Sequence, residues 1–192
     1  MQEYVTTHEH AIFLKALVFA ADLHAGQLKK GCSKLPFINH PIKVASLLSS
    51  ISRKRDITLL VAALLHDVLE KTAAGPAGIR AAFGKEVLGI VREVTDDKSL
   101  PDPERKQRQI ESAGQLSPAA KKIRLADKIC NMRDIMTYPL GWSQQRKLTY
   151  LEFAGKLAAE LRGTDTRLER MFHREHAAAV RALKAGAVRG VL

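Results

Sequence analysis

Apolar residues recur along most of this chain at intervals of three and four positions, the spacing of one face of an α-helix. The β-branched residues never alternate with polar ones, as they do in half-buried strands. Gly, Pro and capping residues divide the pattern into successive segments. We expect helices from Thr6 or Thr7 to Gly26, from Pro41 to the basic turn Arg53-Lys54-Arg55, over about Ile57 to Lys71, from Pro76 to near Gly84, from Glu86 to Glu93, from Pro103 onward, from Pro118 to near Met136, from Ser143 to about Leu161, and from Asp165 through Phe172.

Composition agrees with a helical protein. Aromatic residues make up only 5% of the chain, while Ala, Leu, Lys and Arg dominate. A hydrophobic content of 46% with 27% charged residues indicates a globular chain and not a disordered one. We therefore expect an all-α bundle of roughly eight to ten helices, with residues 1–192 forming one domain and residues 176–192 a loose basic tail.

The apolar run that ends at Leu65 leads directly into His66, Asp67 and Glu70. Burying these groups is costly unless they are paired or bound to something. On one continuous helix their spacings of three and four place all three on neighbouring positions of one face. An imidazole beside a carboxylate, with a second carboxylate one turn later, suits a metal ion plus an acid that handles its water. A buried ion pair is the alternative that this pattern leaves open.

A second acid within an apolar helix is Asp127, with Asn131 four residues later on the same face. His40 stands at a helix start, where its ring either points into the protein or caps the helix at the surface. His40, His66, Asp67 and Asp127 together offer two nitrogen and two oxygen ligands, a set suited to Mn, Fe or Zn. They come from three separate helices, so the set depends on how those helices pack.

The net charge of +11 favours polyanionic partners such as nucleic acids, anionic lipids and phosphorylated metabolites. Against nucleic acid, the basic residues are spread along the chain and no aromatic residues are interleaved with them. No apolar stretch reaches the length of a membrane span, and no signal peptide is evident. Cys32 and Cys130 form no C-x-x-C pair, so we expect a reducing cytoplasm. The oligomeric state is left open.

Several segments between about residues 10 and 175 resemble, in order and with compatible spacing, the HD-domain hydrolases of the RelA/SpoT type. The resemblance is strongest to the small stand-alone members that degrade the alarmone (p)ppGpp. It implies an all-α HD-domain bundle that cleaves the 3′-diphosphate of (p)ppGpp to give GDP or GTP plus pyrophosphate. Bifunctional relatives carry a synthetase domain downstream, for which this chain has no room, so we expect a hydrolase only. The segments are Phe37-Ile38-Asn39-His40-Pro41, Ala62-Ala63-Leu64-Leu65-His66-Asp67, Glu93-Val94-Thr95-Asp96-Asp97-Lys98, Lys121 to Asp134, and Gly141-Trp142-Ser143.

The same resemblance implies the roles of individual residues. The partner is a small guanine nucleotide, with neither nucleic acid nor membrane expected. Without the resemblance, the two lysines of the loop would be interpreted as solvated, Arg146 as surface and Tyr150 as core. One Mn²⁺ per chain is implied at His40, His66, Asp67 and Asp127, and substrate contacts are implied at Lys29, Lys30, Asn131, Arg146 and Tyr150.

One position departs from the family pattern, which follows His-Asp after two residues with Glu-Asp. Here that pair is Glu70-Lys71. Both family acids are implicated in positioning and activating the attacking water, so we expect Glu70 and Lys71 to be catalytic positions. Lys71 either opposes the metal charge, or attracts the departing pyrophosphate, or faces solvent at a helix end. The alternatives to an active hydrolase are therefore a catalytically weakened alarmone sensor and a phosphohydrolase of another nucleotide such as NADPH.

Overall fold

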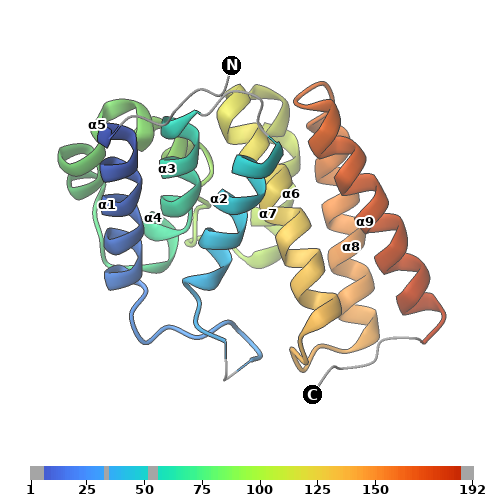
Figure 1. Cartoon of the computed structure of the whole chain (residues 1–192). Coiled ribbons are helices and arrows are strands. Elements are labelled where there is room, and N and C mark those ends of the chain that lie inside the picture. Colours follow the sequence, from blue (N-terminus) through green and yellow to red (C-terminus); the bar gives the residue numbers. More distant parts are fainter. Residues whose placement is uncertain (1–6, 33–34, 52–55, 187–192) are drawn as a thin grey trace.

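The computed structural model describes residues 7–32, 35–51 and 56–186, and in these ranges the protein is an all-α bundle (Figure 1). This confirms the fold class expected from the sequence. Pro36 and Leu28 form an isolated β-bridge in the loop after the first helix. The elements are α1 (Thr7–Leu23), α2 (Asn39–Ile51), α3 (Ile57–Leu65), α4 (Val68–Lys71), α5 (Pro76–Glu93), α6 (Asp102–Ser112), the 3₁₀ turn η1 (Ala113–Gln115), α7 (Pro118–Thr137), α8 (Gln144–Glu160) and α9 (Thr166–Lys184).

Side-chain caps fix where several of these helices begin. Ser117 accepts a hydrogen bond from the backbone N–H of Ala120 at the start of α7, as the Ser-Pro sequence predicted. Ser143 and Asp165 cap α8 and α9 in the same way. Helix α2 begins at Asn39, two residues before the proline expected at its first position. The predicted basic turn Arg53-Lys54-Arg55 lies outside the described residues.

The predicted continuous helix from Ile57 to Lys71 is wrong in one respect, because it is interrupted between α3 and α4. His66 and Asp67 form a turn, and Asp67 has φ −97° and ψ −6°. The His66 ring takes the carbonyl of Ala63 as a hydrogen-bond partner, which competes with the helical backbone pattern. The region near ψ 0° is one that active-site residues often occupy. The two side chains are therefore brought together by a turn and not by one helix face.

The two short helices predicted on either side of Gly84 are joined into α5 across a kink. Gly84 has φ +87°, in the left-handed region that favours glycine. Helix α6 has no buried residue, as its run of charged and polar side chains predicted.

The loose tail expected over residues 176–192 is instead helical through Lys184. Ala179 and Leu183 are buried in the hydrophobic core, which holds this part of α9 against the bundle. The alanine-rich sequence suggested fraying, but burial of one apolar stripe stabilises a helix more than its local propensity does.

The helices α1, α3, α2, α7 and α9 lie in that order across the molecule (Figure 1). Helix α5 packs on α3, and α8 packs on α7 and α9. Six of the eight apolar residues of α3 are buried, including the last five, Val61 to Leu65, so its end lies inside the protein. The bundle thereby places the turn at His66 and Asp67 beside the start of α2 and the middle of α7. Among the described residues, no helix has both the length and the apolar character to cross a bilayer.

Candidate active site

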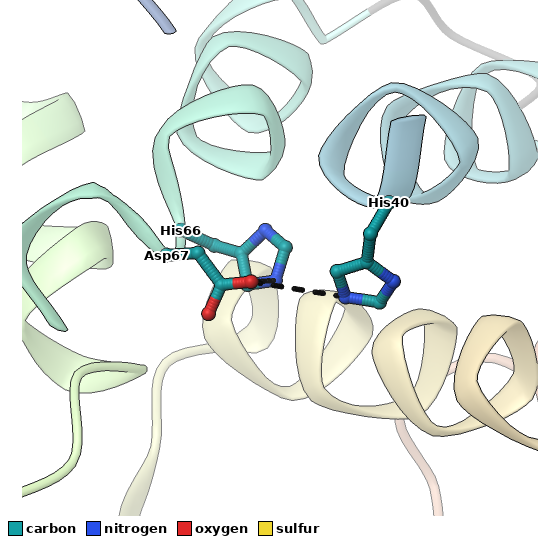
Figure 2. A group of neighbouring side chains, drawn as sticks. All are labelled: His40, His66 and Asp67. Carbon is teal, nitrogen blue, oxygen red and sulfur yellow. Dashed lines mark ion pairs between the residues drawn. The ribbon is translucent and has the colours of Figure 1, made fainter. Parts of the chain in front are cut away.

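Three of the predicted metal ligands converge where α2, α3 and α4 meet (Figure 2). His40 extends from the first turn of α2, and His66 and Asp67 extend from the turn after α3. Asp67 Oδ2 lies 3.3 Å from His66 Nε2 and 3.9 Å from His40 Nε2. One ligand atom from each residue lies within 4.8 Å of the other two, and all three side chains are buried. This is the spacing of ligands around a single ion.

Two of these buried atoms have no hydrogen-bond partner, namely His66 Nε2 and Asp67 Oδ2. His66 Nδ1 donates to the carbonyl of Ala63 at 2.7 Å, which leaves Nε2 directed into the cluster. Buried polar atoms without partners are costly, and a cation between them would satisfy both. The donor set therefore fits a divalent metal ion.

Asp127 of α7 adjoins this cluster through His40. Its Oδ1 lies 2.9 Å from His40 Nε2 and accepts a hydrogen bond of 2.6 Å from Asn131. Its Oδ2 accepts a hydrogen bond of 2.9 Å from Lys128. Burial by itself raises the pKa of the Asp127 carboxyl, but the charge of Lys128 and the contact with His40 outweigh it and hold that pKa well below its usual range. Asp127 is therefore ionised, as a metal ligand must be.

The cluster forms part of the wall of a cavity of about 290 Å³. The cavity combines cationic, anionic and apolar groups, which is typical of a site for a polar small molecule. Its lining contains every site residue predicted from the sequence except Arg146. The lining residues are Lys29, Lys30, Phe37, His40, His66, Asp67, Glu70, Lys71, Val94, Asp96, Arg124, Asp127, Lys128, Asn131, Ile135, Leu140, Trp142 and Tyr150.

Lys71 faces the cavity, so the solvent-facing alternative for this residue is wrong. Its Nζ lies 2.6 Å from Asp67 Oδ1 and 4.6 Å from the centre of the Phe37 ring. Burial lowers the pKa of Lys71, but the carboxylates of Asp67 and Glu70 outweigh burial and raise it. The side chain is thus a cation. It holds one oxygen of Asp67 and leaves the other directed at His40 and His66.

Glu70 lies on the cavity wall one residue before Lys71. Burial raises the pKa of the Glu70 carboxyl above its ordinary value, although the charge of Lys71 opposes this shift. A carboxylate with a raised pKa is a better proton acceptor than an exposed one.

The loop that carries Lys29 and Lys30 is held at several points. The backbone of Lys29 donates to Leu35 at 2.8 Å, next to the bridge between Leu28 and Pro36. Gly31 has φ +86°, and a Cβ at this position would collide with the carbonyl oxygen of Leu140. Lys29 forms an ion pair with Asp134 of α7. Lys30 also lies at the cavity wall but is exposed, so the two lysines occupy different environments.

The remaining substrate residues predicted from the sequence lie on α7 and α8. Asn131 and Tyr150 line the cavity, and burial raises the pKa of the Tyr150 phenol well above its ordinary value, so it stays protonated. Arg146 is exposed and does not line the cavity. Its guanidinium carbon lies 4.3 Å from the centre of the Trp142 ring, which is itself part of the lining.

The profile of the family described as HD domain matches residues 16–159. The chain belongs to the HD-domain family. It is 45% identical over 166 residues to the guanosine-3′,5′-bis(diphosphate) 3′-pyrophosphohydrolase MESH1 of Drosophila melanogaster, covering 86% of this chain and 93% of that protein. To the human protein of the same name it is 44% identical over 162 residues, covering 84% of this chain and 90% of that one.

Solved structures agree with this assignment. A structure described as a metazoan ortholog of SpoT that hydrolyses ppGpp and plays a role in starvation responses matches with a TM-score of 0.84 at 41% identity. The match covers 94% of this chain and 99% of that one. The HD domain of this chain includes the buried cluster and the whole cavity lining within residues 16–159.

Several lining residues of the HD domain were not predicted from the sequence. Lys128 is buried beside Asp127, and the adjacency of a Lys to an Asp in an apolar helix was the signal available for it. Arg124 forms an ion pair of 2.8 Å with Asp96, which is 28 residues away in sequence, and no local sequence pattern predicts this contact. Trp142, the one Trp of the chain, was noted within the segment Gly141-Trp142-Ser143 that resembles the family, but was not assigned a role in the site.

Proposed function

We propose that this chain is a metal-dependent hydrolase that removes the 3′-diphosphate of (p)ppGpp, giving GDP or GTP plus pyrophosphate. The observation that carries the proposal is the buried cluster of imidazoles and carboxylates on the wall of a cavity lined with lysines. Relatives named for this activity are matched along most of their length, 93% for the Drosophila protein. A cationic cavity beside a metal cluster fits the chemistry of a diphosphate ester.

His40, His66, Asp67 and Asp127 are the residues that we propose hold the ion, one per chain. Two neutral imidazoles and two carboxylates suit Mn²⁺, which is the ion we propose. When bound, such an ion supplies positive charge for phosphate oxygens and lowers the pKa of water. Lys71 and Lys128 each bond to one of the acids and fix its orientation.

The lysines on the cavity wall are proposed to bind the diphosphate. Lys29, Lys30 and Lys71 present ammonium groups to the same cavity. Preorganised cations of this kind stabilise the charge that develops on a transferred phosphoryl group. Asn131 and Tyr150 are proposed to contact the nucleoside, and Arg146 to contact it from the outer side of Trp142.

Glu70 is proposed as the acid that orients the attacking water. It accepts a proton from the water and aligns it in line with the bond between phosphorus and the 3′ oxygen. Its raised pKa, caused by burial, suits a group that takes up a proton near neutral pH. The cavity lining contains four carboxylates among the described residues, and two of them, Asp67 and Asp127, are proposed metal ligands. Of the other two, Glu70 lies three residues after Asp67, whereas Asp96 is distant in sequence and pairs with Arg124.

The natural setting that we propose is the cytoplasm. Both cysteines, Cys32 and Cys130, are free thiols, which a reducing compartment maintains. The proposed partner is a small guanine nucleotide, and no role for nucleic acid or a membrane is needed.

A second candidate, an alarmone sensor with little turnover, is favoured by one observation. Lys71 bonds to Asp67 at 2.6 Å, so a cation already lies against a proposed metal ligand. Like charges repel, and this lysine therefore opposes an ion at the cluster. The sensor and the enzyme share a binding site and differ in turnover alone.

Pyrophosphate release from ppGpp separates these candidates. We expect the purified protein to release pyrophosphate with added Mn²⁺ and to stop when a chelator removes the ion. Glu70→Gln should keep the metal and ppGpp binding while losing at least about 10²-fold in kcat, the contribution typical of a catalytic acid or base. A wild-type protein that binds ppGpp with Mn²⁺ present but releases no pyrophosphate would establish the sensor instead.

A further inference from the structure

The carboxylate of Asp134 on α7 is shared between two lysines from different parts of the fold. Lys29 bonds to its Oδ2, and Lys43 of α2 bonds to its Oδ1 at 2.8 Å. The Asp134 side chain is only 3% exposed. Burial by itself raises the pKa of the Asp134 carboxyl, but the hydrogen bonds from Lys29 and Lys43 outweigh it and lower that pKa. The group is therefore an ionised carboxylate with a cation on each oxygen.

The two lysines lie in separate hollows of the surface. Lys29 lines the active-site cavity. Lys43 lines a groove between α2 and α7, where its Nζ lies 4.8 Å from the centre of the Tyr138 ring and 3.3 Å from the Tyr138 hydroxyl. Asp134 also lines this groove, so it separates the two ammonium groups. Only one of the two, Lys29, can reach a ligand in the cavity.

Lys29 depends on Asp134 because its own loop gives its side chain little support. The backbone of the loop is held by the hydrogen bond between Lys29 and Leu35. Among the described residues, the Lys29 ammonium has one side-chain hydrogen bond besides that to Asp134, a long one of 3.5 Å to Asn131. A lysine side chain loses rotamer entropy when it is ordered. Asp134, 105 residues away in sequence, orders it before any ligand arrives.

We propose that Asp134 is a positioning residue that holds the Lys29 ammonium in place for the anionic substrate. This inference rests on the proposed function, in which Lys29 contacts the substrate. A purely electrostatic role for Asp134 leads to the opposite expectation. A negative charge near a cationic site weakens anion binding, so its removal should then strengthen that binding. If Asp134 instead positions Lys29, its removal should weaken anion binding. The Lys29 side chain would then be free to move and would be repelled by Lys43.

Kinetics of ppGpp hydrolysis with Mn²⁺ distinguish these two roles. For Asp134→Asn, positioning predicts a KM raised about five-fold or more with kcat within about two-fold, since only binding depends on Lys29. Lys43→Met, which keeps Asp134 on Lys29, should leave KM within about two-fold. A lowered KM in Asp134→Asn together with a raised KM in Lys43→Met would overturn the proposal in favour of charge alone.

A double-mutant cycle tests whether the effect passes through Lys29. In a Lys29→Met background, Asp134→Asn should add less than about two-fold to KM, because the group it positions is already gone. A full additional effect in that background would mean that Asp134 acts through the fold in general. If Asp134→Asn does not fold, Asp134→Asn combined with Lys43→Met removes the repulsion between the lysines. Positioning then predicts a KM above that of Lys43→Met, and an equal or lower KM would overturn the proposal.

Binding measured separately distinguishes a failure of this inference from a failure of the proposed function. The dissociation constant of ppGpp, measured by titration calorimetry in the presence of a chelator, should change among the variants as KM does. A wild-type protein that binds ppGpp without hydrolysing it would contradict the enzyme but still test Asp134. A wild-type protein that binds ppGpp neither with the chelator nor with Mn²⁺ would overturn both.

Discussion

Lys71 puts a positive charge against a carboxylate that we expect to bind a metal ion. The contact of 2.6 Å with Asp67 directs one carboxylate oxygen away from the cluster and leaves the other facing the two imidazoles. The ammonium is also held over the Phe37 ring at 4.6 Å. These two contacts fix Lys71 on the cavity wall, beside the proposed metal site.

Replacing Lys71 by Met tests whether its charge helps or hinders. We expect Lys71→Met to keep about one Mn²⁺ per chain and to lose about ten-fold in kcat/KM for ppGpp, because a cation at the diphosphate is removed. Such a loss corresponds to about 1.4 kcal/mol. Steady-state kinetics and metal analysis measure the two quantities.

The matched control for Lys71 is Lys85→Met, an exposed lysine on α5 that does not line the cavity. It should leave kcat/KM within about two-fold, as surface changes far from a site usually do. An increase in kcat for Lys71→Met would show that the lysine hinders turnover, and our assignment of its role would be wrong.

At the scale of the elements, the position of the loop between α1 and α2 depends on Gly31. Gly31 combines a left-handed backbone with an approach to the Leu140 carbonyl that leaves no space for a Cβ. Leu140 is buried and lines the cavity next to Trp142. The close approach therefore docks the loop of Lys29 and Lys30 against the segment that precedes α8.

A substitution at Gly31 should separate the loop from this segment. We expect Gly31→Ala to raise KM for ppGpp by about ten-fold or more, because the methyl group displaces Lys29 and Lys30 from the cavity wall. Backbone strain at a left-handed position costs about 1–2 kcal/mol in addition. Kinetics and thermal unfolding report the two effects.

Gly26 provides the control within the same loop. It also has positive φ, +72°, but a Cβ there meets no atom within 4 Å. Gly26→Ala should show the loss of stability from strain and little change in KM. Equal effects on KM from the two substitutions would contradict the docking role of Gly31.

On the scale of the whole molecule, the proposed metal site joins distant parts of the bundle. His40 belongs to α2, Asp127 to α7, and the turn after α3 supplies the other two groups. An ion that binds them links three packed helices and binds the folded state alone. Metal binding should therefore stabilise the fold as well as support catalysis.

Thermal unfolding with and without Mn²⁺ measures this linkage. At one hundred times its dissociation constant, an ion stabilises a folded protein by about 2.7 kcal/mol. For a domain of this size we expect the melting temperature to rise by about 5–10 °C. His66→Ala and Asp127→Ala should lose the rise, while His173→Ala, an exposed histidine of α9, should keep it. A full rise in the first two variants would exclude the assigned ligands.

The sequence by itself determined the helical elements and most of their ends. Apolar spacing and capping residues act within one or two turns, so Ser117 could be placed at the start of α7. A helix end was expected near Gly84, where the structure instead has a kink within α5. The same local logic failed at α9, where burial of Ala179 and Leu183 stabilises a segment that its composition suggested would fray.

The tertiary structure alone decided how the side chains of the site meet. His40 reaches Asp127 across 87 residues, and Lys29 reaches Asp134 across 105. Such contacts depend on the packing of α2 between α3 and α7, which no local pattern encodes. The turn at His66 and Asp67, the position of Arg146 outside the cavity and the sharing of Asp134 by two lysines have the same origin. The turn and the shared carboxylate are set by where buried charges from distant elements find partners, because an unpaired charge in the interior is too costly to leave. The exposed Arg146 is instead placed by its contact with the Trp142 ring.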